Sequence, residues 1–219
     1  MESKQGDSMR ALDTTTTASR EVLWNVSSTA NQVAMYAVFA LSMVICLWGF
    51  WRRLVLWTEG QADNTRLSSP ARRFDRFWQN VLLQRKVNRE PGPGRFHTLI
   101  FWGFVTLLFT TTVVFVDNDL GVKIYHGRFY LGVTLLSDIF GLAMMVGVGL
   151  AFHRRYIDRP DRLHSTPSDL WMLALLWLMA AQGFLLEGLR IHATNDPWAM
   201  YSPVGYLVAQ FFWGLSADA

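Results

Sequence analysis

The chain has 219 residues, of which 51% are hydrophobic, 14% are aromatic and only 17% are charged. Soluble domains carry charges at about a quarter of their positions, so this composition argues against an ordinary soluble protein. The single cysteine, Cys46, excludes an intrachain disulfide, a Cys-x-x-Cys-His haem attachment and an iron–sulfur cluster held by this chain's own thiolates. Any redox centre must therefore be bound non-covalently and without thiolates.

Four apolar runs are long enough to cross a bilayer, which requires about 20 mostly apolar residues. They are residues 32–51, 98–116, 129–152 and 170–186. The first two carry no charge, the third carries only Asp138, and Glu187 closes the fourth. A fifth run, 203–215, is shorter and is expected to be an unfinished span, a half-helix or an interfacial helix. We predict an all-α, polytopic transmembrane bundle with four full spans and a partial fifth apolar segment.

The distribution of polar and basic residues predicts the topology. Residues 1–30 are polar and Ser/Thr-rich, so we expect a disordered tail before a transmembrane domain over 31–219. Of the 20 Lys and Arg residues, 14 lie in the two loops that follow the first and third spans. Because cytoplasmic loops are rich in Lys and Arg, we place the N-terminus outside and both basic loops inside the cell inner (cytoplasmic) membrane. These basic residues flank spans and face anionic lipid, which argues against nucleic acid as a partner.

The first inner loop contains an amphipathic pattern at about residues 72–87. Its apolar residues recur at helical spacing, and its basic residues lie largely on other faces. This pattern predicts a helix lying on the inner leaflet. The alternative is a docking surface for a cytoplasmic partner. The sequence PGPG at 91–94 is expected to break the chain before the second span.

Histidines at the span boundaries are the candidate haem ligands. A b-type haem in a helical bundle needs neutral imidazoles on the two sides of its ring plane. His97 opens the second span on the inside, and the nearby Arg95 could hold the haem propionates. An interfacial histidine that faces water or lipid would give the same pattern, so both interpretations stay open. His126 before the third span and His153 after it are weaker candidates.

Two acidic positions are candidates for a quinone or proton site. Asp138 lies ten residues into the third span, on a small and partly polar stripe that must face protein. A charge at that depth costs about 2.5–3.5 kcal/mol on insertion scales, so it is functional by default, although a helix-packing hydrogen bond is an equal alternative. Glu187 and Arg190, spaced i, i+3, are expected to pair. They would also suit one wall of a quinone pocket near the outer surface.

Three stretches together carry a family resemblance: FHTLIFWGFVTL (96–107), TLLSDIFGLAMMVGVGLAFHRRYIDRP (134–160) and GFLLEGLRI…WAMYSPVG (183–205). Their order and content resemble the membrane domain of heterodisulfide-reductase-like iron–sulfur oxidoreductases. That domain is related to the gamma subunit of respiratory nitrate reductase, a five-span di-haem cytochrome b. The resemblance implies a b-type cytochrome with one or two haems that passes electrons between membrane quinone and a cytoplasmic iron–sulfur protein or domain. It also implies that His97 is an axial haem ligand.

The sequence departs from this family at two points. The gamma subunit has a second histidine ten residues further along the same helix, where this sequence has Leu107. A second haem would therefore need another ligand, for which His126 is the candidate. The family's opposing ligands come from a later span that would follow residue 219, and its iron–sulfur clusters from a cysteine-rich module. We therefore expect these parts in a longer polypeptide or in a separate subunit.

Two other functions remain as alternatives. The chain could be a haem-free membrane anchor or quinone-binding subunit for a soluble redox module. It could also be a small transporter that uses Asp138 as a proton site. A transporter would be expected to show discontinuous helices and repeat symmetry, and neither is visible in the sequence.

Overall fold

The computed structural model describes residues 17–24, 26, 28–60, 69–161 and 163–213, and every regular element within these ranges is helical. It divides into two units, residues 21–83 and residues 1–20 with 84–219, which are described separately. Four helices are long and apolar enough to cross a membrane. The predicted all-helical class and the four candidate spans are therefore confirmed.

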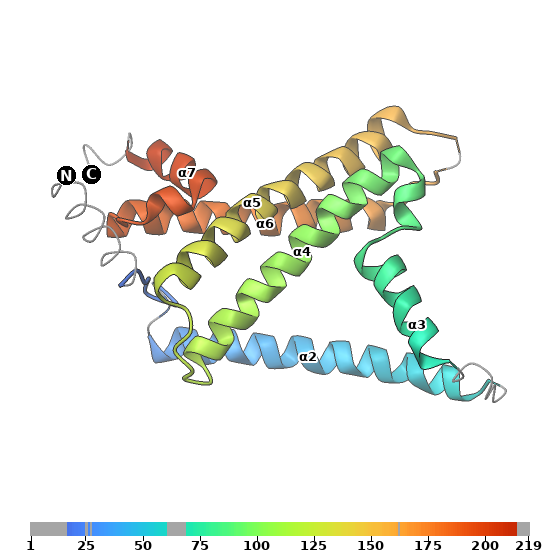
Figure 1. Cartoon of the computed structure of the whole chain (residues 1–219), viewed down its shortest axis with the longest axis horizontal. Coiled ribbons are helices and arrows are strands. Elements are labelled where there is room, and N and C mark those ends of the chain that lie inside the picture. Colours follow the sequence, from blue (N-terminus) through green and yellow to red (C-terminus); the bar gives the residue numbers. More distant parts are fainter. Residues whose placement is uncertain (1–16, 25, 27, 61–68, 162, 214–219) are drawn as a thin grey trace, which may run out of the picture. The chain divides into compact units, whose positions relative to one another are not determined.

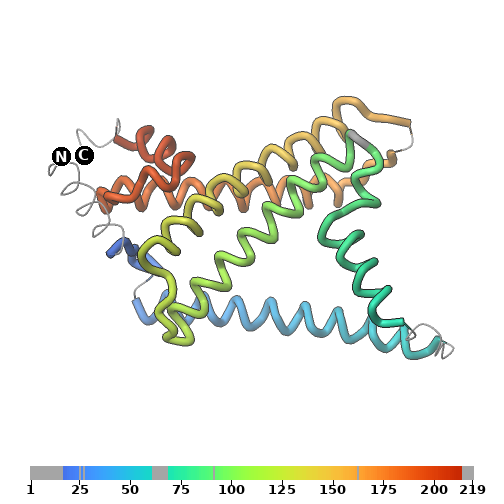
Figure 2. Tube along the Cα trace, viewed as in Figure 1, coloured from blue at the N-terminus to red at the C-terminus, as the bar shows by residue number. Residues whose placement is uncertain are grey.

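The smaller unit contains the first candidate span, α2 (Thr29–Thr58), which is drawn in blue in Figures 1 and 2. Its 30 residues extend about 45 Å at 1.5 Å per residue. The side chain of Ser28 caps its N-terminus by accepting the N–H of Asn31 at 3.3 Å. The run of apolar residues and this cap together explain an uninterrupted helix.

The predicted amphipathic segment is also helical but shorter than expected. It forms α3 (Pro70–Phe77), which continues as a π-helical turn over Trp78–Leu82. The helix ends before 87 because Gln84 adopts a left-handed backbone conformation with φ of 53°. Its position on the inner leaflet remains a prediction.

The larger unit is built on three long helices: α4 (Pro91–Asn118), α5 (Gly127–Phe152) and α6 (Pro167–Thr194). They lie side by side, and α5 packs against both of the others (Figure 1). A short π-helical turn over His153–Asp158 extends α5. Because α4 and α5 run in opposite directions, the start of α4 lies at the same end as the end of α5.

The expected break at PGPG was wrong, because α4 begins at Pro91 and includes the whole motif. Proline has no backbone N–H and a fixed φ that suits the first helical turn, where N–H groups have no partner within the helix. A motif that breaks a helix interior can therefore begin a helix. The start of α6 is also stabilised at its N-terminus, in this case by a capping box. There Asp169 accepts the N–H of Thr166 at 2.9 Å.

Part of the predicted disordered tail has a defined place in the larger unit. Ala18 is fully buried, and its carbonyl oxygen accepts the N–H of Gly127 at 2.6 Å. The side chain of Arg20 reaches Glu187 on α6. The prediction of disorder is therefore wrong for residues 17–20, while residues 1–16, 25 and 27 lie outside the described residues.

Glycine permits the close approach of α4 and α5. A Cβ atom built on Gly147 would lie 2.9 Å from both Ile100 Cγ1 and the carbonyl oxygen of Phe96. One built on Gly103 would lie 2.6 Å from Met144 Cβ. Real Cβ atoms do not approach this closely, so any side chain at these positions would separate the two helices. Small residues serve this purpose widely between membrane helices.

We expect Gly147→Val to lower the free energy of unfolding in detergent by about 1–3 kcal/mol, because the added side chain overpacks the α4–α5 contact. Gly132→Val on the same helix is the matched control, because a Cβ atom at Gly132 would meet nothing within 4 Å. Its effect should stay within about 0.5 kcal/mol. Equal losses in the two variants would contradict the packing described here.

Candidate functional site

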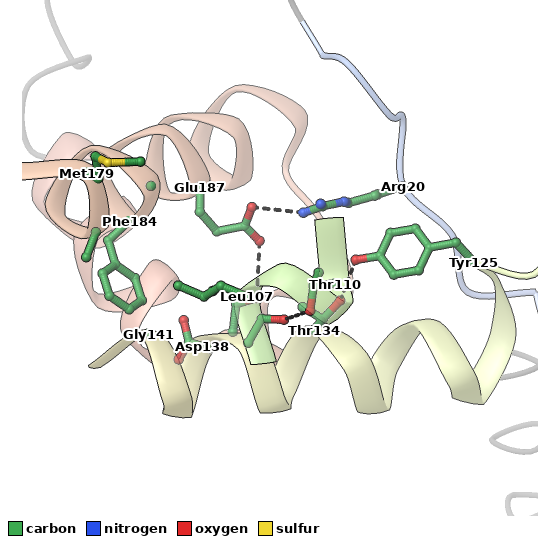
Figure 3. Close-up of a pocket in the computed structure, with 14 residues that line it drawn as sticks. Arg20, Leu107, Thr110, Tyr125, Thr134, Asp138, Gly141, Met179, Phe184 and Glu187 are labelled. Atoms are coloured by element: carbon green, nitrogen blue, oxygen red, sulfur yellow. Dashed lines mark hydrogen bonds and ion pairs between the residues drawn. The ribbon is translucent and has the colours of Figure 1, made fainter. Parts of the chain in front are cut away.

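A pocket of about 200 Å³ lies among α4, α5 and α6 in the larger unit (Figure 3). Its apolar lining includes Leu107, Met179 and Phe184. Hydroxyl groups and carboxylates complete the wall. These polar members are Thr110, Tyr125, Thr134, Ser137, Asp138, Glu187 and Ser202, with Arg20 as the cation. The pocket thus combines an apolar interior with hydrogen-bonding groups.

Glu187 and Arg190 form the ion pair that their spacing predicts. Arg190 Nη2 lies 2.9 Å from Glu187 Oε1, and Arg190 Nη1 lies 2.7 Å from Asp196 Oδ2. Both side chains are largely buried, and Ser202 donates a further hydrogen bond to Glu187 at 3.1 Å. A carboxylate among apolar helices needs such partners, because an unpaired charge there is costly.

Arg20 is a site residue that the sequence reasoning missed. Its guanidinium lies 3.1 Å from Glu187 Oε2 and 5.4 Å from the ring centroid of Tyr125. Figure 3 shows Arg20 and Glu187 pointing toward each other, with the Tyr125 ring beside Arg20. The polar composition around Arg20 indicated a tail, and no local pattern connected it with a glutamate 167 residues away. The one signal in the sequence was an acid at the end of the fourth span, for which Arg190 was the expected partner.

Hydroxyl groups on α4 and α5 form the other side of the pocket. Thr110 Oγ1 and Ser137 Oγ lie 2.6 Å apart and join the two helices. Tyr125 Oη lies 3.3 Å from Thr134 Oγ1. Thr134 belongs to the small and partly polar stripe that also carries Asp138. Thr110 and Ser137 had no such signal, because Ser and Thr in membrane helices commonly hydrogen-bond to their own backbone, as Ser137 does.

Asp138 faces protein, as predicted, and its partners belong to α7 (Pro203–Trp213). The N–H of Val204 donates to Asp138 Oδ2 at 2.8 Å, and the N–H of Gly205 donates to Oδ1 at 3.1 Å. The carboxylate therefore caps the N-terminus of a helix that is distant in sequence. This geometry gives Asp138 a packing role, and its place in the pocket lining leaves the predicted quinone or proton role open.

The partial fifth apolar run forms α7, a helix of 11 residues beside α6. Three contacts fix its direction: Gly205 with Glu187, Val208 with Gly188, and the ring of Trp213 with the ring of His192. Because these contacts advance in the same order along both helices, α7 runs in the same direction as α6. Residues 195–202 therefore return along α6 before α7 begins. Which of the three expected forms α7 takes in a membrane stays a prediction.

His97 has a defined orientation at the start of α4. Its Nδ1 lies 2.9 Å from Gln84 Oε1, and an amide oxygen can only accept, so Nδ1 carries the proton. No partner for Nε2 is found in the part of the chain that the structure describes. Ligating histidines commonly donate their other N–H to an oxygen in this way. This arrangement leaves the predicted haem-ligand role of His97 open.

The other predicted cofactor residues do not gather around His97. His126 precedes α5 at the opposite end of the bundle, next to Tyr125 of the pocket. His153 lies at the same end as His97 but is exposed, with Nδ1 3.5 Å from Asp158 Oδ1. Arg95 is exposed on α4. Among the described residues, no group of three or more His, Cys, Asp or Glu side chains could hold a bare metal ion.

We expect Asp138→Ala to lower the free energy of unfolding by about 1–3 kcal/mol, because it leaves the N–H groups of Val204 and Gly205 without an acceptor. Hydrogen exchange of these two amides should accelerate more than exchange in the middle of α5. Asp161→Ala, at an exposed loop position, should change neither quantity. Unchanged protection of α7 in Asp138→Ala would show that the cap is not required.

Comparison with known proteins identifies similar oxidoreductases. The chain is 30% identical over 195 residues to the EtfAB:quinone oxidoreductase of Syntrophomonas wolfei subsp. wolfei, covering 84% of this chain and 27% of that protein. It is 31% identical over 93 residues to the probable iron-sulfur-binding oxidoreductase FadF of Bacillus subtilis, covering 42% and 13%. It is 26% identical over 117 residues to one subunit of the dihydromethanophenazine:CoB–CoM heterodisulfide reductase of Methanosarcina barkeri, covering 51% and 44%.

The chain spans less than half the length of each of these three relatives. No family model matches it, and no solved structure matches it significantly. The relatives agree with the heterodisulfide-reductase-like, iron–sulfur oxidoreductase resemblance carried by the three sequence stretches. With its four apolar helices, the chain is thus a multi-pass membrane protein similar to parts of these oxidoreductases.

Proposed function

We propose that this chain is the membrane b-type cytochrome portion of a quinone-linked oxidoreductase. It would transfer electrons between membrane quinone or quinol and a cytoplasmic iron–sulfur protein or domain, from the cell inner membrane with its N-terminus outside. The observation that carries the proposal is the pocket among α4, α5 and α6, where apolar walls meet hydroxyl and carboxylate groups. The similarity of 84% of the chain to an EtfAB:quinone oxidoreductase supports quinone as the reactant.

The pocket offers what a quinone head group requires. The quinone ring would contact Leu107, Met179 and Phe184. The oxygen atoms of a quinone need hydrogen-bond donors from the protein, and the hydroxyl groups of a quinol need acceptors. The Thr110 and Ser137 hydroxyl groups have lone pairs that could accept from a quinol, and the Thr110 O–H could turn to donate to a quinone. Glu187, held by two arginines, places a fixed negative charge beside the ring.

His97 would hold the haem iron through Nε2, with its orientation set by the hydrogen bond to Gln84. Bound there, haem supplies a one-electron carrier. Gln84 is buried, and its left-handed backbone directs the side chain back toward α4. Arg95, two residues before His97, would pair with the propionates, with exposed His153 at the same end. His97 is exposed on α4, so other parts of the assembly would also have to contact a haem held there.

Electron transfer between the pocket and the His97 end of the bundle would require an electron carrier near each of these two ends. His97 and Thr110 of the pocket are separated by 13 residues of α4, or about 20 Å along the helix axis. His126 lies at the pocket end and is the candidate iron ligand of a second haem. The basic loops would dock an acidic iron–sulfur partner, because complementary charge orients such encounters.

The alternative function is a haem-free membrane anchor or quinone-binding subunit for a soluble redox module. It would use the same pocket and the same basic loops. The transporter is less well supported, because both oxygen atoms of Asp138 already accept backbone N–H groups. A spectroscopic measurement distinguishes the cytochrome from the anchor.

The chain, purified within its native assembly and produced with ample haem, should give a b-type reduced-minus-oxidised absorption spectrum, with quinol as the reductant. His97→Ala should lose the signal assigned to this haem while remaining folded by circular dichroism. His164→Ala, in the exposed loop before α6, should retain the full signal. A colourless wild-type assembly would exclude the cytochrome and favour the anchor, and a full signal in His97→Ala would reassign the ligand.

A further inference from the structure

A second pocket, of about 370 Å³, lies at the end of the bundle where α4 begins and α5 ends. It is separate from the proposed quinone site and shares none of its residues. Its lining is partly apolar and partly basic, and comprises Glu90, Pro93, Phe96, Ala151, Arg154, Arg155, Leu163 and Leu173. Because it lies at helix ends, this pocket is located at the boundary between hydrocarbon and water.

Two arginines of this pocket have unused hydrogen-bonding capacity. Arg155 Nη2 lies 2.6 Å from Asp169 Oδ2 and 3.1 Å from the carbonyl oxygen of His164, but its Nε is buried without an acceptor. Arg154 is half-buried and makes no side-chain hydrogen bond or ion pair within the described residues. A buried guanidinium N–H without an acceptor is uncommon in folded proteins and indicates a missing partner.

The acids near the pocket do not satisfy these groups. Asp169 is engaged by Nη2 of Arg155, and its Oδ2 also accepts the N–H and O–H of Thr166. Glu90 lines the pocket but has an interaction of its own. Arg154 and the Nε of Arg155 therefore remain available for an oxygen-rich anion.

The apolar surface continues from this pocket along α5 and α6. Leu173 lines both the basic pocket and a neighbouring pocket of about 420 Å³. The remaining lining of the neighbouring pocket contains no charged side chain, and comprises Val148, Gly149, Phe152, Leu170, Ala174, Trp177 and Leu178. An anion with a long apolar chain would satisfy both pockets together, whereas a soluble anion would use only the first.

We propose that these two pockets bind one anionic phospholipid. Its phosphodiester group accepts hydrogen bonds from Arg154 and from the Nε of Arg155, and an acyl chain lies in the apolar pocket beyond Leu173. Arginine suits this role because its planar guanidinium matches phosphate oxygen atoms. Basic pockets between membrane helices at the cytoplasmic side are established sites for anionic headgroups. The site is at the end that the distribution of Lys and Arg assigns to the cytoplasm.

Delipidated full-length chain in neutral detergent provides the test, with thermal unfolding and native mass spectrometry as readouts. Phosphatidylglycerol should raise the unfolding temperature and remain bound as a one-to-one adduct. Phosphatidylcholine with the same acyl chains, and inorganic phosphate, should do neither. Equal effects of phosphatidylcholine would overturn headgroup recognition. Equal effects of inorganic phosphate would reduce the site to one for an adventitious ion only.

Variants locate the site. Arg154→Gln should weaken phosphatidylglycerol binding roughly tenfold or more, because it removes a charge-assisted hydrogen bond. Arg128→Gln makes the same charge change at the exposed other end of α5 and should bind normally. Ala174→Phe, at an exposed position of the apolar pocket, should weaken binding without changing the unfolding temperature of the lipid-free protein. Wild-type affinity in both Arg154→Gln and Ala174→Phe would overturn the proposal.

Discussion

A buried carboxylate, that of Glu187, determines how the end of the larger unit that contains the pocket is assembled. Its charge lies among apolar helices and must be matched by partners from the protein. Those partners come from three parts of the chain: Arg20 from the N-terminal segment, Arg190 from α6 and Ser202 from the turn before α7. Asp196 then balances the second arginine. One acid thus brings together segments that are distant in sequence and closes the pocket wall.

The same ion pairs explain why α7 can lie beside α6. The chain turns at Asn195, returns along α6 and places the N-terminus of α7 at Asp138 on α5. Gly205 makes this approach possible, because a Cβ atom there would lie 2.8 Å from Glu187 Cγ. Glu187 and Asp138 therefore stabilise different parts of this arrangement. Glu187 holds the flanking segments through arginines, and Asp138 holds a helix end through its backbone.

Features that depend on local sequence could be predicted, and features that depend on distant contacts could not. Continuous apolar residues defined the four spans, and i, i+3 spacing identified the Glu187–Arg190 pair. The inward orientation of Asp138 followed from the cost of exposing it to lipid. No local sequence pattern indicated the ion pair between Arg20 and Glu187. The Ser/Thr-rich segment around Arg20 has the composition of a disordered tail, and this composition does not depend on what Arg20 contacts.

Backbone conformation was the second source of error. PGPG begins α4, since the first turn of a helix tolerates proline that its interior does not. The amphipathic helix ends early because Gln84 has a positive φ, a conformation that a glutamine in the sequence does not indicate. That residue also orients His97, so the error concerned the candidate haem site directly. His97 was singled out by its residue type and position, while its contact with Gln84 required the structure.

The proposed function depends on quinone binding in the pocket bordered by Glu187. Photoaffinity labelling with an azido-quinone, followed by peptide mapping, tests it most directly. We expect adducts on the pocket-lining parts of α5 and α6, competed away by unlabelled quinone and reduced in Glu187→Gln. Competed adducts confined to α2 or to the basic end of the bundle, with the pocket unlabelled, would contradict it.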